Sequence, residues 1–458
     1  MEYGDSQSSW RLNSGIIRFS LPEKHMLTFA GLAIIVMVVS LLILRKLAPV
    51  VCLTLIPFIG ALLAGFGFAD IGKFYSAGLN SVIQVATMFI FAITFFGVMQ
   101  DTGVFRPIVN GMVGISRGNV VTVAVCTAVV GMLAHLDGVG ATTFLLTVPT
   151  LLPLYRRLGM NPYLMMLLLA LGAGILNMMP WAGPLGRAAA VTDLDPAALW
   201  QPLIPLQLIG AGLLVVLAAV LGVFEARRLR KQGPLQAADD AEPLEDLNDM
   251  QPLPKLFFVN MALFLGVIGT LISGILPSGY IFMIGLGIAL VINYPDVDEQ
   301  LERIRAHAPN ALLMGAIILA AGSFLGVLNG SGMLKAIAAD LVRVLPSEAT
   351  PYLHLILGVF GLPLDLVLST DAYYFALLPV ILEIVSAYGV ETTSAIYALQ
   401  IGNVIGTFVS PFSPALWLGL GLAGLDMGRH IRYSLLPMWA FSLVLLGVAV
   451  GLGLIKIG

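Results

Sequence analysis

The chain has 458 residues, of which 59% are apolar and 11% are charged, and its formal net charge is −3. Soluble domains carry about 45–50% apolar and about 25% charged residues, so this composition excludes an ordinary soluble protein and indicates a membrane protein. The small negative charge gives no reason to expect a nucleic-acid partner. Two cysteines, Cys52 and Cys126, lie in apolar segments and match no disulfide framework or metal-ligand spacing.

The first half of the chain starts with a polar stretch and continues through apolar segments long enough to cross a bilayer. Residues 1–25 show no hydrophobic pattern and predict a flexible N-terminal tail, with Met26 as a candidate native start. The first apolar segment is longer than a signal-peptide core, and Arg45 and Lys46 follow it, so we expect a retained helix. We predict spans at 27–44, 48–67 and 82–100, two apolar arms around a polar tip within 119–155, a helix from 161 that is broken near 177–184, and a span at 202–224.

A long polar run at 227–254 separates the first half from the second. It is basic at its start and acidic further on, which predicts a solvated linker. The second half then repeats the pattern of the first, so the predicted units are 26–226 and 255–458. We predict spans at 256–274, 280–294 and 308–328, two arms within 350–386, a broken helix at 394–424 and a span at 433–455.

The two halves are also similar in sequence. Residues 95–109 align with residues 324–338 at an offset of 229 positions, and both segments contain two glycines at matching places. The segment that ends at Pro149 aligns with the segment that ends at Pro379 at an offset of 230 positions. A nearly constant offset over separate segments indicates an internal repeat rather than chance similarity between apolar runs.

Each pair of apolar arms can form two full spans or a re-entrant hairpin that returns to its own side. With hairpins, each half crosses the membrane five times, and the 23 lysines and arginines divide into fifteen on one side and eight on the other. The richer side is expected to be cytoplasmic, which places the linker inside and both termini outside the cell membrane. We therefore predict an all-α integral membrane protein of two inverted repeats, each with five transmembrane helices, a re-entrant hairpin and a proline-broken helix.

Polar residues gather at the first hairpin tip, at 135–144. Irregular backbone at membrane depth is tolerated where it lines a cavity, and paired breaks in inverted halves indicate the substrate site of a transporter. An ionisable residue at this depth is functional by default, so Asp137 is predicted to coordinate a cation, a proton or a substrate-bound metal. His135 either shares that role or is a packing residue. The candidate substrate contacts at this tip are Gly138, Gly140, Thr142 and Thr143.

The second tip carries the polar triplet Ser369, Thr370 and Asp371. A helix cap would explain these residues, but their position matches the first tip and favours substrate contact, with Asp371 in metal or proton coupling. Asp365 precedes the triplet and is a candidate proton carrier.

The two broken helices supply further candidates. Arg187 suits bidentate binding of a carboxylate, although an arginine that extends to the membrane interface is the alternative. Asn177 lies on the other side of the first break, and Asn403, Ser410 and Ser413 offer neutral ligands at the second. Half-helix N-termini that point at such a site favour an anionic substrate.

No catalytic motif is found. The sequence contains no nucleophile elbow, phosphate-binding loop or HExxH metal motif. We therefore predict a protein that is not an enzyme, has no tightly bound cofactor and transports its substrate on an ion gradient.

Several of these segments resemble the citrate–metal–proton symporter family of the ion-transporter superfamily. The resemblance implies uptake of citrate through the inner membrane as a complex with a divalent cation such as Mg²⁺ or Ca²⁺, coupled to protons. It also implies a homodimer in which a mobile transport domain moves like an elevator against a scaffold. The segments that carry it are HLDGVGATTF at 135–144, LPLYRRLGM at 152–160, NMMPWAGPLGRAA at 177–189, INYPDVDEQLERIRAHAPNAL at 292–312 and STDAYYFALLPV at 369–380.

The chain departs from the family pattern at some of these positions. Val139 stands where the first tip usually has a second acid, and Thr370 stands where the second tip usually has asparagine. The metal, the proton stoichiometry and the identity of the carboxylate therefore stay open. The alternatives are uptake of another di- or tricarboxylate, and cation–proton exchange by a transporter of the same superfamily.

Overall fold

The computed structural model describes residues 23–44, 46–105, 107, 119–232 and 253–457. These residues form helices and connecting turns, with no β-strand among them, which confirms the predicted all-α class. Four helical segments in the described part are long and apolar enough to span a membrane, and shorter apolar helices of 10–17 residues accompany them. The four are Phe68–Asp101, Pro196–Lys231, Val297–Gly330 and Met427–Gly451.

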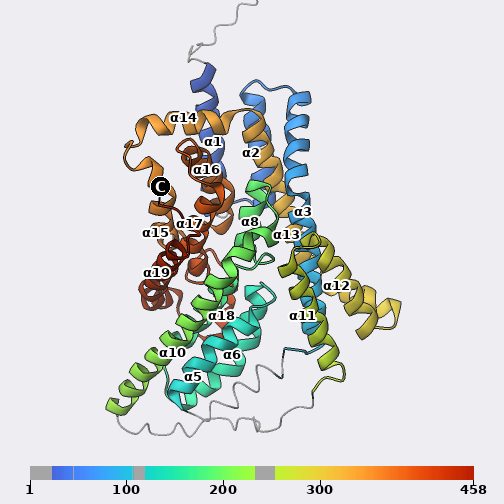
Figure 1. The fold of residues 1–458 in the computed structure, drawn as a ribbon, viewed down its shortest axis with the longest axis vertical. Helices are drawn as coiled ribbons and strands as arrows, with labels where there is room; N and C mark the ends of the chain where they lie inside the picture. The colour runs from blue at the N-terminus through green and yellow to red at the C-terminus, as the bar shows by residue number, and fades with distance from the viewer. Residues whose placement is uncertain (1–22, 45, 106, 108–118, 233–252, 458) are drawn as a thin grey trace, which may run out of the picture.

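The first half follows the predicted order of elements (Figure 1). Its helices are α1 (Glu23–Ile43), α2 (Pro49–Leu63), α3 (Phe68–Asp101), α5 (Val120–Ala134), α6 (Gly140–Arg157), α7 (Pro162–Leu176), α8 (Gly183–Thr192), α9 (Pro196–Trp200), the 3₁₀ turn η1 (Gln201–Leu203) and α10 (Ile204–Gln232). At 1.5 Å per residue, the 15 residues of α5 are shorter than the ~30 Å of bilayer hydrocarbon. Helix α2, which the sequence predicts as a full span, has the same length, so the hairpin stays a prediction.

The second half has the same order. Its elements are α11 (Phe257–Ser273), α12 (Ser278–Asn293), α13 (Val297–Gly330), α14 (Met333–Val344), η2 (Thr350–Tyr352), α15 (Leu353–Leu364), η3 (Ala372–Leu377), α16 (Leu378–Ser386), α17 (Thr392–Val404), η4 (Ile405–Phe408), α18 (Pro414–Ala423) and α19 (Met427–Gly451). Within this order, η3 is a π-helix, whereas the corresponding start of α6 is α-helical.

Three helices are longer than predicted. Helix α3 begins at Phe68 rather than near residue 82, and α13 begins at Val297 rather than near residue 308. Apolar length marks only the part of a helix inside the membrane, and the first turn of α13 is polar and capped by the Asp296 side chain. Helix α10 continues to Gln232 and so includes the basic residues expected to open the linker. Positive charge at a helix C-terminus is favourable, which explains the extension.

Helices α3 and α13 lie side by side along their lengths (Figure 1). At one end, the Asp101 carboxylate pairs with Arg303 at 3.5 Å and with His307 at 2.9 Å. At the other end, Phe74 lies against Gly330. Because low numbers on one helix meet high numbers on the other, the two helices run antiparallel. Asp101, at the C-terminal end of α3, therefore joins the two helices through an ion pair with Arg303.

The α3–α13 contact is also symmetric. With the offset of 229, Gly78 corresponds to His307 and Gly97 corresponds to Gly326. The pair Gly78 and Gly326 therefore corresponds to the pair His307 and Gly97 when each residue is replaced by its repeat equivalent. The structure contains both close contacts. Antiparallel packing of corresponding helices about a two-fold axis is the arrangement that inverted repeats require. Which side of the membrane each half faces stays a prediction.

The hairpins and broken helices pack across the two halves. The second arm of the first hairpin, α6, packs against α18, which follows the break in the second half. In the same way, η3 and α16 of the second hairpin pack against α8, which follows the break in the first half. This reciprocal packing brings both hairpin tips and both breaks to one place in the fold.

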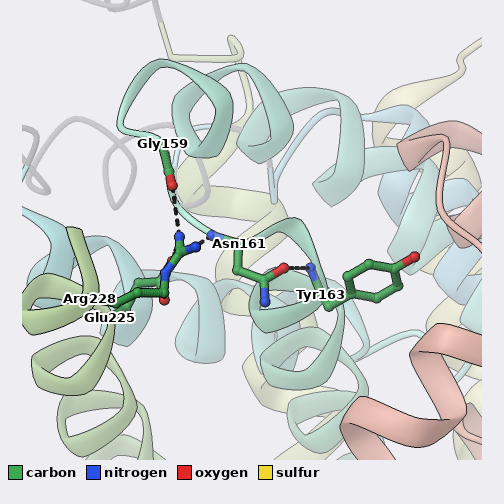
Figure 2. Close-up of polar contacts among 5 residues, drawn as sticks. All are labelled: Gly159, Asn161, Tyr163, Glu225 and Arg228. Carbon is green, nitrogen blue, oxygen red and sulfur yellow. Dashed lines mark hydrogen bonds and ion pairs between the residues drawn. The ribbon is translucent and has the colours of Figure 1, made fainter. Parts of the chain in front are cut away.

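A polar clamp, formed by Gly159, Asn161, Glu225 and Arg228, fastens the base of the first hairpin to α10 (Figure 2). Arg228 Nε and Nη2 donate to the two oxygens of Glu225 at 2.9 and 2.6 Å, and Nη2 also donates to the Gly159 carbonyl at 2.9 Å. Glu225 Oε1 accepts a third hydrogen bond from the Asn161 backbone N–H at 2.6 Å. The Glu225 side chain is only 7% exposed, so its charge depends on these donors.

Replacement of Glu225 by glutamine should destabilise the protein. The amide nitrogen would face an Arg228 donor, so at least one charge-assisted hydrogen bond is lost, at a cost of about 1–3 kcal/mol. Thermal unfolding of the purified protein in detergent measures the effect. Glu348→Gln makes the same chemical change at an exposed position and should leave the midpoint unchanged. Equal midpoints for the two variants would contradict a structural role for the clamp.

Candidate substrate-binding site

A cavity of about 680 Å³ lies where the two hairpin tips and the two breaks meet. Cavities of about 300–1,000 Å³ are typical of small-molecule sites. A fifth segment, the α1–α2 connection, contributes Lys46 and its neighbours to the wall. The polar or glycine residues that line the cavity are Lys46, Gly138, Gly140, Asn177, Gly183, Arg187, Ser369, Thr370, Asp371, Thr407 and Ser413.

Arg187 and Asp371 form an ion pair across the cavity wall. Arg187 Nε donates to Asp371 Oδ1 at 2.8 Å, and the two side chains are 9% and 14% exposed. The pair joins α8 of the first half to the start of η3 in the second half. The pair uses Nε. The two Nη groups of Arg187 therefore have N–H donors that form no hydrogen bond with a described residue. A carboxylate in the cavity can accept from them.

The N-terminus of α8 provides further donors. The helix begins at Gly183, both Gly183 and Pro184 line the cavity, and no side chain caps its first turn. Free N–H groups and the positive end of the helix dipole both favour an anion at this position. A side chain at Gly183 would meet the Arg187 Nη1 atom, so glycine keeps the guanidinium close to the backbone donors.

Asn177 reaches the cavity with the support of two buried residues behind it. His135 Nε2 lies 2.9 Å from Asn177 Oδ1, and His135 Nδ1 lies 2.7 Å from the Thr143 hydroxyl. Neither His135 nor Thr143 lines the cavity, and both are fully buried. The Asn177 Nδ2 group has no partner among the described residues. A buried amide donor without a partner is suited to a ligand oxygen.

The first tip divides its groups between two cavities. Gly138 and Gly140 face the large cavity, whereas Asp137 and Thr142 line a second cavity of about 250 Å³ beside α3. Asp137 accepts the Thr142 hydroxyl at 2.5 Å and the Val139 N–H at 2.9 Å. The turn requires a left-handed residue, and Gly138 has φ of +72°. The predicted contact of Thr142 with the main cavity is therefore not present.

Asp365, Asn403 and Ser410 also lie outside the large cavity, behind the second tip. The Ser410 hydroxyl donates to the backbone carbonyl of Asp365 at 2.5 Å. All three residues are buried, and Asp365 Oδ2 and Asn403 Oδ1 have no partner among the described residues. The second tip itself, Ser369, Thr370 and Asp371, lines the cavity as the sequence suggested.

The comparisons with known proteins agree with a transport site. A sequence model described as a citrate transporter matches residues 19–402 of the chain. The chain belongs to the citrate transporter family. A relative from Bacillus subtilis (strain 168), named as a Mg(2+)/citrate complex secondary transporter, is 36% identical over 427 residues, which cover 93% of this chain and 98% of the relative. Another from the same organism, named as a citrate transporter, is 34% identical over 433 residues, which cover 94% and 100%.

A solved structure has the same fold as this member of the citrate transporter family. The YdaH transporter of Alcanivorax borkumensis matches with a TM-score of 0.52 and 18% sequence identity, over 84% of this chain and 88% of that chain. At this identity the likeness shows the fold alone.

Sequence reasoning did not anticipate two polar residues of the cavity in this citrate transporter family member. The position of Lys46 after an apolar segment indicates topology and not a binding site. Thr407 lies in η4, and no motif around it predicts a contact with substrate. The internal repeat does relate Thr407 to a predicted site residue. At the offset of 230 positions, Thr407 corresponds to Asn177 at the first break. Among the described residues, no group of three or more His, Cys, Asp or Glu side chains is arranged to hold a metal ion.

Proposed function

We propose that this chain is a secondary transporter that takes up citrate as a complex with a divalent cation, coupled to protons. The observation that carries the proposal is the charge of the large cavity. Its charged lining residues are Lys46, Arg187 and Asp371, which sum to +1. Citrate with three ionised carboxylates and one divalent cation has a charge of −1, so the complex and the cavity are complementary.

The donors of the cavity also suit a carboxylate-rich ligand. The Arg187 Nη groups, the unpartnered Asn177 amide and the N-terminus of α8 all offer N–H groups. Hydroxyls of the second tip are suited to an oxygen ligand or to water on a bound metal. The name of one relative, a Mg(2+)/citrate complex transporter, supports the same substrate class.

We also infer that the halves are inverted repeats and that transport proceeds by an elevator movement within a homodimer. The antiparallel packing of α3 on α13 supports the inversion. Two packing groups support the movement: α3 packs against α2, α12 and α13, and the hairpins contact the broken helices. The candidate groups for proton or metal coupling are Asp137, His135, Asp371 and Asp365.

Citrate uptake into proteoliposomes that contain only this protein tests the proposal. Uptake is measured with and without an inward proton gradient, and with Mg²⁺, Ca²⁺, Zn²⁺ or a chelator outside. We expect accumulation that needs both a divalent cation and the gradient. Uptake that survives the chelator would overturn transport of a metal complex and leave free citrate or a related carboxylate as the substrate.

A second candidate, cation–proton exchange, is disfavoured by the net charge of +1 in the cavity. Absence of citrate uptake by folded protein, together with sodium-dependent proton movement, would favour that candidate.

A further inference from the structure

The ionisable groups near the hairpin tips differ in their partners. Asp371 pairs with Arg187 at 2.8 Å. Asp137 accepts two hydrogen bonds, one from Thr142 and one from the Val139 N–H. Both carboxylates are therefore satisfied in the ionised form. His135 has a partner on each ring nitrogen, which satisfies the neutral imidazole.

Asp365 lacks such partners. Its side chain is 1% exposed, and Oδ2 has no hydrogen-bond partner among the described residues. Asp365 is also the C-terminal cap of α15, where backbone carbonyls and the helix dipole create a negative environment. An ionised carboxylate that has no donor at one oxygen and no cation beside it is costly in such a place. A proton on the carboxyl removes this cost.

Among the residues that the structure describes, the helices around Asp365 place no lysine or arginine in an ion pair with its carboxyl. From η3, Tyr373 donates its hydroxyl to the Leu399 carbonyl at 3.0 Å, and the Tyr374 hydroxyl has no hydrogen-bond partner in the described part of the chain. From α19, His430 contacts the Phe408 carbonyl through Nε2 at 3.1 Å.

The remaining neighbours are neutral or already paired. Asn403 of α17 is a neutral hydrogen-bonding neighbour of the Asp365 carboxyl, and its Nδ2 also donates to the Gly361 carbonyl at 3.5 Å. The Ser410 hydroxyl donates to the Asp365 backbone rather than to its carboxyl. The nearest arginine of the cavity, Arg187, is held by Asp371. Among the described residues, no lysine or arginine forms an ion pair with Asp365.

The Asp365 carboxyl also contacts the segment that forms part of the cavity wall. A side chain at Gly406 would lie 2.7 Å from Asp365 Oδ2, so the backbone of η4 packs directly on this oxygen. The next two residues, Thr407 and Phe408, line the large cavity. After the break, Phe412, Ser413, Pro414 and Ala415 line it as well. A change of charge at Asp365 therefore reaches the cavity wall through the contact between Asp365 Oδ2 and Gly406 of η4.

We propose that Asp365 is the residue that carries the coupled proton, in a buried site separate from the substrate cavity. The proton binds to a carboxylate oxygen of Asp365 and its release leaves the carboxylate, so no other reactant is needed. Protonation stabilises η4 and the break in the geometry described here, and deprotonation displaces them. The proposal rests on the proposed function, and it distinguishes Asp365 from Asp137 and Asp371, whose carboxylates accept hydrogen bonds from Thr142, the Val139 N–H and Arg187.

Transport by three variants in proteoliposomes tests the assignment. Asp365→Asn places a neutral side chain of the same shape at this position. The variant should therefore retain exchange of citrate and Mg²⁺ between the two sides of the proteoliposome membrane. It should lose accumulation driven by the proton gradient. Asp137→Asn should lower both activities, and Asp298→Asn makes the same change at an exposed position and should match the wild type. Gradient-driven accumulation by Asp365→Asn at the wild-type level would overturn the proposal.

Infrared difference spectroscopy between acidic and alkaline pH gives a readout independent of transport. The carbonyl stretching band of protonated carboxyls should have the same intensity in the wild type and in Asp137→Asn, and should lose the contribution of one carboxyl in Asp365→Asn. Persistence of the full band in Asp365→Asn would also overturn the assignment. If the wild type shows no citrate uptake, the proposed function fails, while the infrared band still reports whether Asp365 holds a proton.

Discussion

Replacement of Arg187 by glutamine should abolish citrate uptake while the protein remains folded in the membrane. The variant removes the Nη donors that face the cavity and leaves Asp371, which is 14% exposed, without its partner. Loss of the charged partner of a buried ligand carboxylate costs about 2–5 kcal/mol of binding free energy. With 1.4 kcal/mol for each factor of ten, the dissociation constant for citrate should rise by at least ~25-fold.

Two further variants separate substrate binding from neutralisation of Asp371. The double variant Arg187→Gln with Asp371→Asn removes both charges, so stability should recover while citrate binding stays weak. Arg187→Lys keeps the charge but loses the planar pair of donors, and should bind citrate with intermediate affinity. Calorimetric titration with citrate and Mg²⁺ measures each constant. Recovery of wild-type affinity in the double variant would mean that Arg187 acts only on Asp371.

Replacement of Gly78 by alanine should destabilise the protein strongly. A Cβ atom at this position would lie 2.0 Å from the Gly322 carbonyl oxygen and 2.7 Å from the Gly326 Cα atom. Both atoms belong to the backbone of α13 and cannot rotate away, so the two helices must separate. Overpacking of this kind costs about 1–3 kcal/mol, and the loss of contact along α3 and α13 adds to it.

The same helix provides a control for this substitution. Gly72 also lies in α3, but a Cβ atom there meets nothing within 4 Å. Gly72→Ala should therefore raise the stability slightly, because alanine is favoured over glycine in a helix by ~1 kcal/mol. Thermal unfolding in detergent and the fraction of monodisperse protein compare the two variants. A midpoint for Gly78→Ala equal to or above that for Gly72→Ala would contradict the close packing of α3 on α13.

The repeat and the spans could be predicted because both leave a direct trace in sequence. Apolar length fixes the part of a helix within the membrane, and a constant offset pairs the halves without knowledge of any contact. The extended starts of α3 and α13 could not be found in this way, because charged residues interrupt the apolar pattern there: Asp70 in α3, and Asp298 and Glu299 in α13. The ion pair of Asp101 with Arg303 and His307 depends on those extensions and was missed with them.

The site shows the same limit at the level of single residues. The breaks and tips predicted where the cavity lies, since Arg187, Asn177 and the second tip all line it. The sequence does not show which side of a tip each side chain faces. His135 and Thr143, predicted at the site, contact each other behind the cavity wall instead. Lys46 was missed because a charge in a loop contains no information about its distance from a cavity.

The π-helix η3 makes the two tips mechanically unequal. A π turn contains one residue more than an α turn, so its conversion would move the preceding chain by one helical position, ~1.5 Å along the axis and ~100° around it. Asp371 is the residue immediately before η3, and a rotation of this size would withdraw its carboxylate from Arg187 without displacing α16. The first tip enters α6 as an ordinary α-helix and has no such slack. The second tip can therefore take up a shift of one residue within η3, a change for which α6 has no corresponding π turn.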